Sequence, residues 1–196
     1  MTNAREVMWL SVEDGLSLEK ARMERRPGGA TLSGTVLAAE GGLPLRVDYT
    51  VTCDESWRTV AATATQSFDG KRRTVRLAHD GDGAWTLDGR PAPSLDGCID
   101  VDLGVSPITN ALPVNRLGLA IGETGAVRAA WVRFPALETV PAEQSYERLG
   151  EHRYRYRSAT SGFVADIEVD TDGLPIDYAG IWQRIAEGPA AATDRD

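Results

Sequence analysis

The sequence predicts a mainly β protein: one antiparallel sheet of many short strands, with a single α-helix near residues 106–118. Three observations lead to this fold class. Seven Asp-Gly pairs punctuate the chain, and both residues tolerate the positive φ of a tight hairpin turn. Between the turns, apolar and polar residues alternate with the period of two that is typical of a half-buried strand. Only one stretch, which begins at Ser106-Pro107, carries a strong helix-start signal.

The strands can be assigned in chain order. Residues 43–53, 59–68 and 163–170 alternate cleanly between apolar and polar side chains, as strands with one wet face do. Residues 16–26 are good helix formers but fit neither the helix period nor the strand period. We predict a strand there because the surrounding chain is β. Residues 127–134 are apolar on both faces, which indicates a strand that is covered on both sides.

The helix follows directly on a strand. Asp100 and Asp102 alternate with apolar residues, so both carboxylates are expected on one face of that strand. Ser106-Pro107 is typical of an N-cap followed by a first-turn proline. Pro113 arrives too soon for a long regular helix and must kink or restart it. Gly118 is a plausible helix stop.

Length and composition limit the function classes. A chain of 196 residues is ordinary for one all-β domain, and we expect that domain over residues 5–187, as a monomer, with a disordered tail over 188–196. The net charge of −8 argues against a nucleic-acid partner. No apolar run is long enough to span a bilayer, and the first residues lack the apolar core of a secretory signal. We therefore expect a cytoplasmic protein.

No motif for a nucleophile, a nucleotide or a metal stands out, so we predict neither a metal site nor a cofactor. The most suggestive pair is Asp100 and Asp102, which are about 7 Å apart by strand rise. Three interpretations remain open: a plain wet strand face, the polar lining of a ligand cavity, or an acid/base pair for glycoside hydrolysis. If the helix packs inside the sheet, these carboxylates need partners such as Arg116 or Asn110.

The same stretch also resembles a known family. The string D-V-D-L-x-x-S-P-x-T-N-x-L-P-V-x-R-L over residues 100–117 is similar to the signature of the putative glycolipid-binding family, a bacterial domain of unknown function. Further agreement comes from Tyr49-x-Val51-x-Cys53-Asp54-x-x-Trp57 and from Gln144-x-Tyr146. The resemblance implies a spiral β-roll, in which one many-stranded antiparallel sheet curls around a central helix. It also implies an amphipathic ligand, such as a glycolipid or another lipid.

We therefore predict a non-enzymatic lipid or glycolipid binder, with the ligand in or at the mouth of the roll. The predicted ligand-binding residues combine polar head-group readers with aromatic walls: Asp100, Asp102, Asn110, Arg116, Trp131, Tyr146, Tyr154 and Tyr156. Two alternatives are a hydrolase that uses Asp100 and Asp102, and a packed structural or protein-interaction module in which the helix fills the roll and leaves no pocket.

Overall fold

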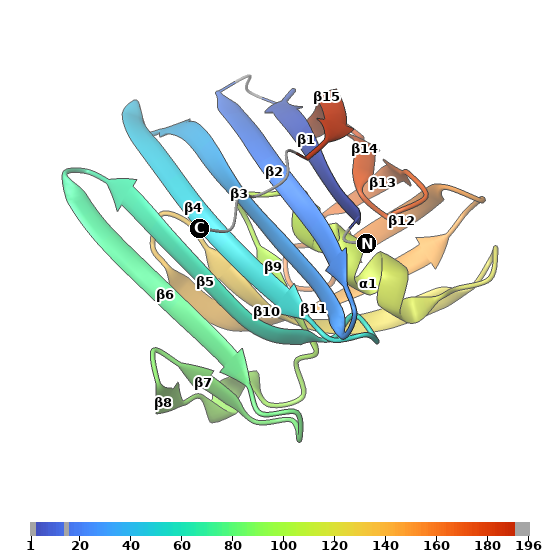
Figure 1. The fold of residues 1–196 in the computed structure, drawn as a ribbon, viewed down its shortest axis with the longest axis horizontal. Coiled ribbons are helices and arrows are strands. Elements are labelled where there is room, and N and C mark those ends of the chain that lie inside the picture. Colours follow the sequence, from blue (N-terminus) through green and yellow to red (C-terminus); the bar gives the residue numbers. More distant parts are fainter. Residues whose placement is uncertain (1–2, 14–15, 191–196) are drawn as a thin grey trace.

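The fold is one large curled sheet around a single short helix, as a computed structural model shows for residues 3–13 and 16–190 (Figure 1). The sheet has fifteen strands in these residues. They are β1 Asn3–Ser11, β2 Ser17–Arg26, β3 Gly29–Glu40, β4 Leu43–Cys53, β5 Thr59–Phe68, β6 Lys71–His79, β7 Trp85–Leu87, β8 Arg90–Pro91, β9 Asp100–Leu103, β10 Thr124–Arg133, β11 Glu138–Arg148, β12 Arg153–Ser158, β13 Val164–Val169, β14 Pro175–Tyr178 and β15 Trp182–Pro189.

Sequential strands pair along most of the sheet. The order is β8-β7-β6-β5-β4-β3-β2-β1-β15-β14-β13-β12-β11-β10-β9, so β1 and β15 join the two halves of the chain. The predicted mainly β class with one large sheet is confirmed. One detail of the prediction is wrong, because β9 and β10 pair in parallel and not antiparallel. Parallel neighbours need a crossover connection, and the helix between β9 and β10 supplies it.

The sheet curls without closing into a barrel. Its edge strand β9 does not meet the opposite edge β8 but lies against β5. The Thr59 backbone N–H donates to the Ile99 carbonyl at 3.1 Å, and the Val101 N–H donates to Thr59 Oγ1 at 3.0 Å. Further along β5, Gln66 Nε2 donates to the Pro135 carbonyl at 2.7 Å. The edge of the sheet formed by β9 and β10 therefore lies inside the part that contains β5, and the sheet as a whole forms a spiral.

The predicted helix is present and short. A 3₁₀ turn over Ile108–Asn110 leads into α1, Ala111–Leu117. Ser106 Oγ accepts the Ile108 N–H at 3.2 Å. The N-cap position itself is Pro107, one residue later than predicted. Pro113 lies in the first turn of α1, where a missing N–H costs no helix hydrogen bond. Gly118 ends the helix with a positive φ of 55°, a conformation that side chains disfavour.

A hydrophobic core packs between the helix and the curled sheet. Ile108, Ala111 and Leu112 have no exposed surface, and they pack in one cluster with inward residues of the sheet such as Leu32 and Val47. The Asp69-Gly70 and Asp88-Gly89 turns have positive φ at both residues, as the hairpin signal predicted.

The predicted domain boundary needs a small change. β15 runs to Pro189, so residues 188 and 189 belong to the sheet and not to the tail. Residues 191–196 and the Asp14-Gly15 turn lie outside the described residues, and the disorder of the tail stays a prediction. Among the described residues, no helix is long and apolar enough to cross a membrane. The monomeric state and the cytoplasmic location stay predictions.

Candidate functional site

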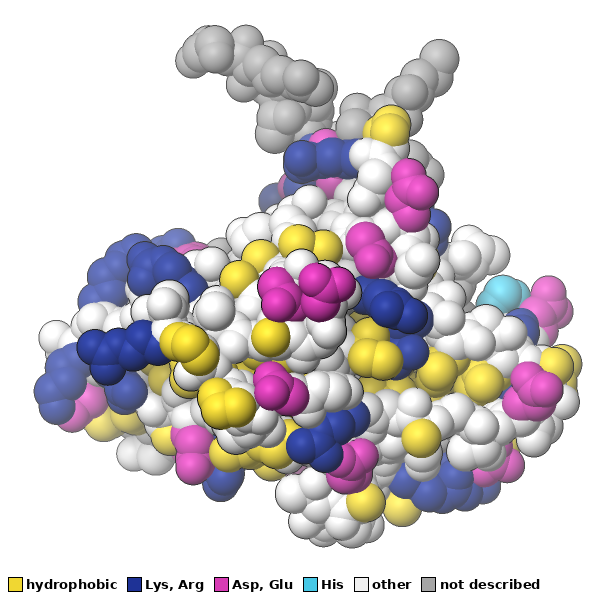
Figure 2. Space-filling model, turned by 90° about the horizontal axis from the view of Figure 1, so that it is seen from below, with side chains coloured by type: hydrophobic (Ala, Val, Ile, Leu, Met, Phe, Trp, Pro, Cys, Tyr) yellow, Lys and Arg dark blue, Asp and Glu magenta, His cyan; other side chains and the backbone are white. Residues whose placement is uncertain are grey.

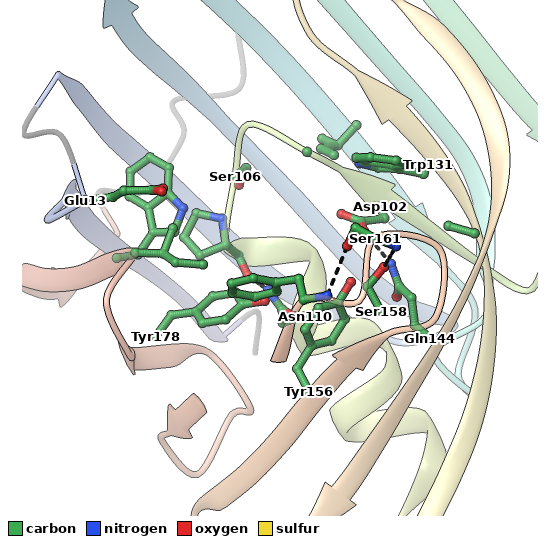
Figure 3. Close-up of a pocket in the computed structure, with 17 residues that line it drawn as sticks. Glu13, Asp102, Ser106, Asn110, Trp131, Gln144, Tyr156, Ser158, Ser161 and Tyr178 are labelled. Atoms are coloured by element: carbon green, nitrogen blue, oxygen red, sulfur yellow. Dashed lines mark hydrogen bonds between the residues drawn. The ribbon is translucent and has the colours of Figure 1, made fainter. Parts of the chain in front are cut away.

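A cavity of about 380 Å³ opens between the 3₁₀ turn and the inner face of the C-terminal strands (Figure 3). Its floor carries polar groups, and its walls carry aromatic rings. The loops around its opening supply Glu13, Gly104, Ser161 and Ile181. We call this end of the roll, formed by residues 12–13, 104–107, 159–163 and 179–181, the mouth end. The roll is therefore not completely filled by its helix.

Adjacent strands bring the lining side chains together. Asp102 on β9 lies in register with Trp131 on β10, and both line the cavity with Gln144 from β11 and Tyr156 from β12. The backbone at Gly104 passes close to the Trp131 ring: a Cβ at this position would lie 2.7 Å from Trp131 Nε1. Glycine at 104 therefore allows the indole to lie against the loop that follows β9.

Asp102 is held by two side chains in a partly buried position. Gln144 Nε2 donates to Asp102 Oδ2 at 2.6 Å, and Thr109 Oγ1 donates to Oδ1 at 3.5 Å. Burial raises the pKa of Asp102 above its ordinary value, and the two hydrogen bonds oppose this rise. The carboxyl group is thus fixed in place while it still lines the cavity, where it can accept further hydrogen bonds.

Asp100 has a different role from Asp102. Arg116 reaches back from α1 and donates from Nε at 3.1 Å and from Nη2 at 2.6 Å to the two Asp100 oxygens. The Asp100 side chain is only 2% exposed and that of Arg116 13%. Burial raises the pKa of Asp100, and the hydrogen bond and charge of Arg116 lower it. The pair ties the helix to β9, and neither residue lines the large cavity.

The geometry does not favour the alternative interpretation of Asp100 and Asp102 as an acid/base pair. Asp100 and Asp102 share only a small internal cavity of about 10 Å³, which holds about one water molecule. Both oxygens of Asp100 are already bound by Arg116. A sugar substrate therefore has no route to both carboxylates at once.

Half of the eight predicted residues line the large cavity: Asp102, Asn110, Trp131 and Tyr156. Tyr146 is buried next to it and donates from its hydroxyl to Asn110 Oδ1 at 2.7 Å. Tyr154 is buried elsewhere along β12, with the Arg148 guanidinium 5.8 Å from its ring centre. Tyr146, Tyr154, Asp100 and Arg116 thus support the surrounding structure.

Several lining residues were missed by the sequence prediction. Tyr178, Trp182, Phe163 and Ser158 line the cavity beside Gln144. Gln144 could have been found, because it alternates with Tyr146 on the inner face of β11. Ser158 and Tyr178 end their strands and Trp182 begins one, and at strand ends alternation carries little information. Phe163 lies just before β13, and its place in the alternating pattern did not distinguish a cavity wall from the core.

The aromatic wall is a contiguous cluster around Tyr156. Its ring centre lies 5.3 Å from that of Tyr146, 6.1 Å from Phe163 and 6.1 Å from Tyr178. The tilted and edge-on arrangements are those that aromatic pairs prefer. Burial raises the pKa of both Tyr156 and Tyr178, so their hydroxyls stay neutral hydrogen-bonding groups.

The buried carboxyl group of Glu19 lies next to the loop of the mouth end that contains Ser106. Glu19 on β2 has no exposed surface, and its Oε1 accepts hydrogen bonds from the Tyr49 hydroxyl and, at 2.7 Å, from Ser106 Oγ. No described residue bonds its Oε2. Burial raises the pKa of Glu19 to about 7, and the two hydrogen bonds oppose the rise. Because Ser106 also lines the cavity, Glu19 anchors the loop that leads into the helix.

The described residues offer no metal centre. No group of three or more His, Cys, Asp or Glu side chains within them is placed to hold a metal ion. The two cysteines, Cys53 and Cys98, are buried and free. The candidate site is therefore the cavity with its side chains.

Comparisons with known proteins found a family match and solved structures that align with this chain. Residues 6–184 match the model of the family described as "Putative glycolipid-binding". A crystal structure of a DUF1089 family protein from Pseudomonas aeruginosa is similar to this chain, with 35% sequence identity and a TM-score of 0.79 over 87% of this chain and 92% of that chain. A beta-barrel-like DUF1849 protein from Brucella abortus aligns at 10% identity and a TM-score of 0.48, over 97% of this chain and 99% of that chain. A search of the curated proteins found no match.

Proposed function

Because this chain belongs to the putative glycolipid-binding family, we propose that it binds an amphipathic ligand without transforming it. The head group of the ligand enters the cavity at the mouth end, and this head group is uncharged and rich in hydroxyls, as a sugar is. The observation that carries the proposal is the combination of fixed polar groups and aromatic rings in one open cavity.

The size of the cavity supports a small ligand or one part of a larger ligand. Its volume of about 380 Å³ lies at the lower end of the range of roughly 300–1,000 Å³ that is typical of small-molecule sites. An amphipathic molecule with a long apolar tail therefore places only its head group inside. The tail extends past Phe163 and Ile181 at the opening.

The charges of the lining support a head group without negative charge. None of the described residues that line the cavity is Lys or Arg, and the two charged residues among them, Asp102 and Glu13, are both acidic. A phosphate or carboxylate would lose its hydration there without gaining a cationic partner. A sugar or another polyol would not meet this cost.

The polar groups suit hydroxyl recognition. Asp102 accepts hydrogen bonds, and the Gln144 amide next to it both donates and accepts. Ser158 and Ser161 add hydroxyls at the opening. The half-buried Trp131 side chain, which carries the Arg133 guanidinium 5.2 Å from its ring centre, adds apolar surface to the cavity lining that suits the C–H side of a sugar ring. Together these side chains supply the few convergent polar contacts that such sites need.

Ligand-dependent stabilisation tests the proposal. We expect neutral glycolipids, and soluble alkyl glycosides as probes, to raise the melting temperature, while anionic phospholipids of equal chain length do not. A ligand at about 100 times its Kd adds roughly 2.7 kcal/mol to the free energy of unfolding. Trp131→Ala should abolish the shift. Trp57→Ala is a matched control, because Trp57 is also half-buried but lines a separate groove with Arg25 and Asp54.

Native mass spectrometry after gentle purification gives a second readout. A co-purified neutral glycolipid that Trp131→Ala loses would support the proposal. If the panel leaves the melting temperature unchanged and no lipid co-purifies, the proposal fails. Turnover of a glycoside or ester panel that Asp102→Asn abolishes would instead support the hydrolase alternative.

A further inference from the structure

The deepest part of the cavity is formed by side chains that also border the small internal cavity. Asp102, Asn110 and Gln144 line both spaces, so they form the partition between them. Gln144 is only 7% exposed and Asn110 only 8%. The opening is formed instead by exposed residues such as Glu13 and Phe163. A ligand that enters at the mouth end therefore meets this partition with its leading end.

Of the three side chains in the partition, Asn110 is already committed to the protein. Its Oδ1 accepts from the Tyr146 hydroxyl at 2.7 Å, and its Nδ2 donates to the Pro107 carbonyl at 2.9 Å. These two bonds use both ends of the amide and fix its orientation. Asn110 therefore holds the 3₁₀ turn against β11, and the recognition of a ligand at this depth is left to Asp102 and Gln144.

Asp102 and Gln144 form one continuous polar edge with unused hydrogen-bonding capacity. Gln144 Nε2 donates to Asp102 Oδ2 at 2.6 Å, as Figure 3 shows. Each carboxylate oxygen has more than one lone pair, and the amide keeps a second N–H. No described residue donates to the Gln144 carbonyl oxygen Oε1. The edge therefore presents acceptors on Asp102 directly beside a donor and an acceptor on Gln144.

Two adjacent hydroxyl groups match this edge. Neighbouring hydroxyls of a sugar ring lie about one hydrogen-bond length apart, similar to the 2.6 Å that separates Asp102 Oδ2 from Gln144 Nε2. One hydroxyl can donate to Asp102 while its neighbour accepts from the Gln144 N–H. A single hydroxyl would leave one of the two side chains without a partner, and an unpaired buried polar group is costly.

The charge of the lining shows that these hydroxyls must be unsubstituted by acidic groups. The chain has 21 Lys and Arg residues, and Figure 2 shows several of them beside Asp and Glu on the outer surface. None of the Lys and Arg residues that the structure describes lines the cavity. A sulfate or phosphate ester on either hydroxyl would therefore face the Asp102 carboxylate without a counter-charge.

We infer that the cavity recognises the terminal sugar of its ligand by two adjacent free hydroxyls, which Asp102 and Gln144 bind together. This inference rests on the proposed function, in which the tail leaves the cavity past Phe163 and Ile181. The glycosidic carbon that carries the tail then faces the opening. In a hexopyranose ring the 3- and 4-hydroxyls are the farthest from that carbon, so they reach the partition. The ligand class is a hexopyranoside with free 3- and 4-hydroxyls.

A deoxy series measures the contribution of each hydroxyl without altering the protein. The parent probe is the tightest binder among octyl gluco-, galacto- and mannopyranoside, measured by calorimetry below its micelle concentration. We expect the 3-deoxy and 4-deoxy forms to bind at least about tenfold more weakly, because each leaves a buried polar group unpaired. The 2-deoxy and 6-deoxy forms should bind within about twofold of the parent.

Gln144→Ala assigns the effect to a side chain of the protein. The variant should bind the parent more weakly, and removing the hydroxyl that Gln144 binds should cost it nothing further. One of the 3-deoxy and 4-deoxy forms should therefore bind this variant as well as the parent does. Gln183→Ala, at an exposed position on β15, is the matched control and should keep the full deoxy pattern.

The outcomes separate this inference from the proposed function. If a parent binds but its 3-deoxy and 4-deoxy forms bind equally well, or if the 2- and 6-hydroxyls carry the largest losses, the inference is overturned while the proposed function stands. A Gln144→Ala variant that keeps both losses also overturns it. If none of the three parents binds, both fail. The deoxy pattern of the unaltered protein decides the inference if Gln144→Ala folds poorly.

Discussion

Replacing Glu19 by glutamine should remove a large part of the pH dependence of folding stability. Glu19 is fully buried and keeps its proton up to about pH 7 in the folded protein, against an ordinary pKa of 4.5. Since a pKa difference of one corresponds to about 1.4 kcal/mol, the folded state loses roughly 3 kcal/mol relative to the unfolded chain as the pH rises through this window.

The direction of this change in stability follows from the order in which the unfolded and folded states release the Glu19 proton. Below the unfolded pKa both states are protonated, so this contribution to stability is fully present. As the pH rises, the unfolded chain releases its proton first, and the contribution is lost through the folded pKa. The glutamine side chain of the Glu19→Gln variant resembles the protonated acid, because its carbonyl oxygen can still accept from Tyr49 and Ser106. The stability of the variant therefore does not fall in this way as the pH rises.

Chemical denaturation at about pH 5 and about pH 8 measures the effect. The stability of Glu19→Gln minus that of the unaltered protein should increase by about 2.5 kcal/mol between these two conditions. Groups that titrate identically in both proteins cancel in this difference. Glu168→Gln, at an exposed position on β13, is the matched control for the chemical change. A difference for Glu19→Gln that stays constant across this range would refute the assignment of a raised pKa to the buried carboxyl group.

Substitutions at three further positions have defined outcomes. Arg116→Met should cost about 3–5 kcal/mol in urea denaturation, because it leaves Asp100 buried without its cation; a cost below about 1 kcal/mol would contradict the anchoring role of the pair. Gly118→Ala should cost about 1 kcal/mol, since α1 ends there with φ of 55°, and Gly118→Asn should cost less; equal costs would mean that backbone strain is not the cause. Asp102→Asn should weaken binding of a neutral glycoside about tenfold in calorimetry while stability changes little, and unchanged affinity would remove Asp102 from the site.

Local patterns predicted the elements that depend on neighbouring residues. The helical segment between Ser106 and Gly118 and the Asp-Gly hairpins were found because caps and turns are decided within a few residues. The strand over residues 17–26 was harder to recognise for a physical reason. Its inward face holds Glu19 together with Ala21 and Met23, so a buried carboxyl group interrupts the apolar alternation.

The candidate site was predicted only in part. Asp102 and Asn110 were found because they lie in one short stretch with a distinctive pattern, and Trp131 and Tyr156 because aromatic residues on strands commonly face a core or a cavity. Tyr154 has the same pattern as Tyr156, two residues apart on one strand face. Which of the two reaches the cavity depends on the curvature of the sheet, which alternation does not encode.

The sequence by itself determined the mainly β class, the single helix, the family resemblance and the two acidic side chains on one strand. Only the tertiary structure separated those two carboxylates. Arg116 on the helix binds Asp100, while Gln144, far along the chain on β11, orients Asp102 at the cavity. The reason is that a strand pattern decides only which face a side chain takes. The partner that it meets on that face depends on how the sheet curls and where the helix packs.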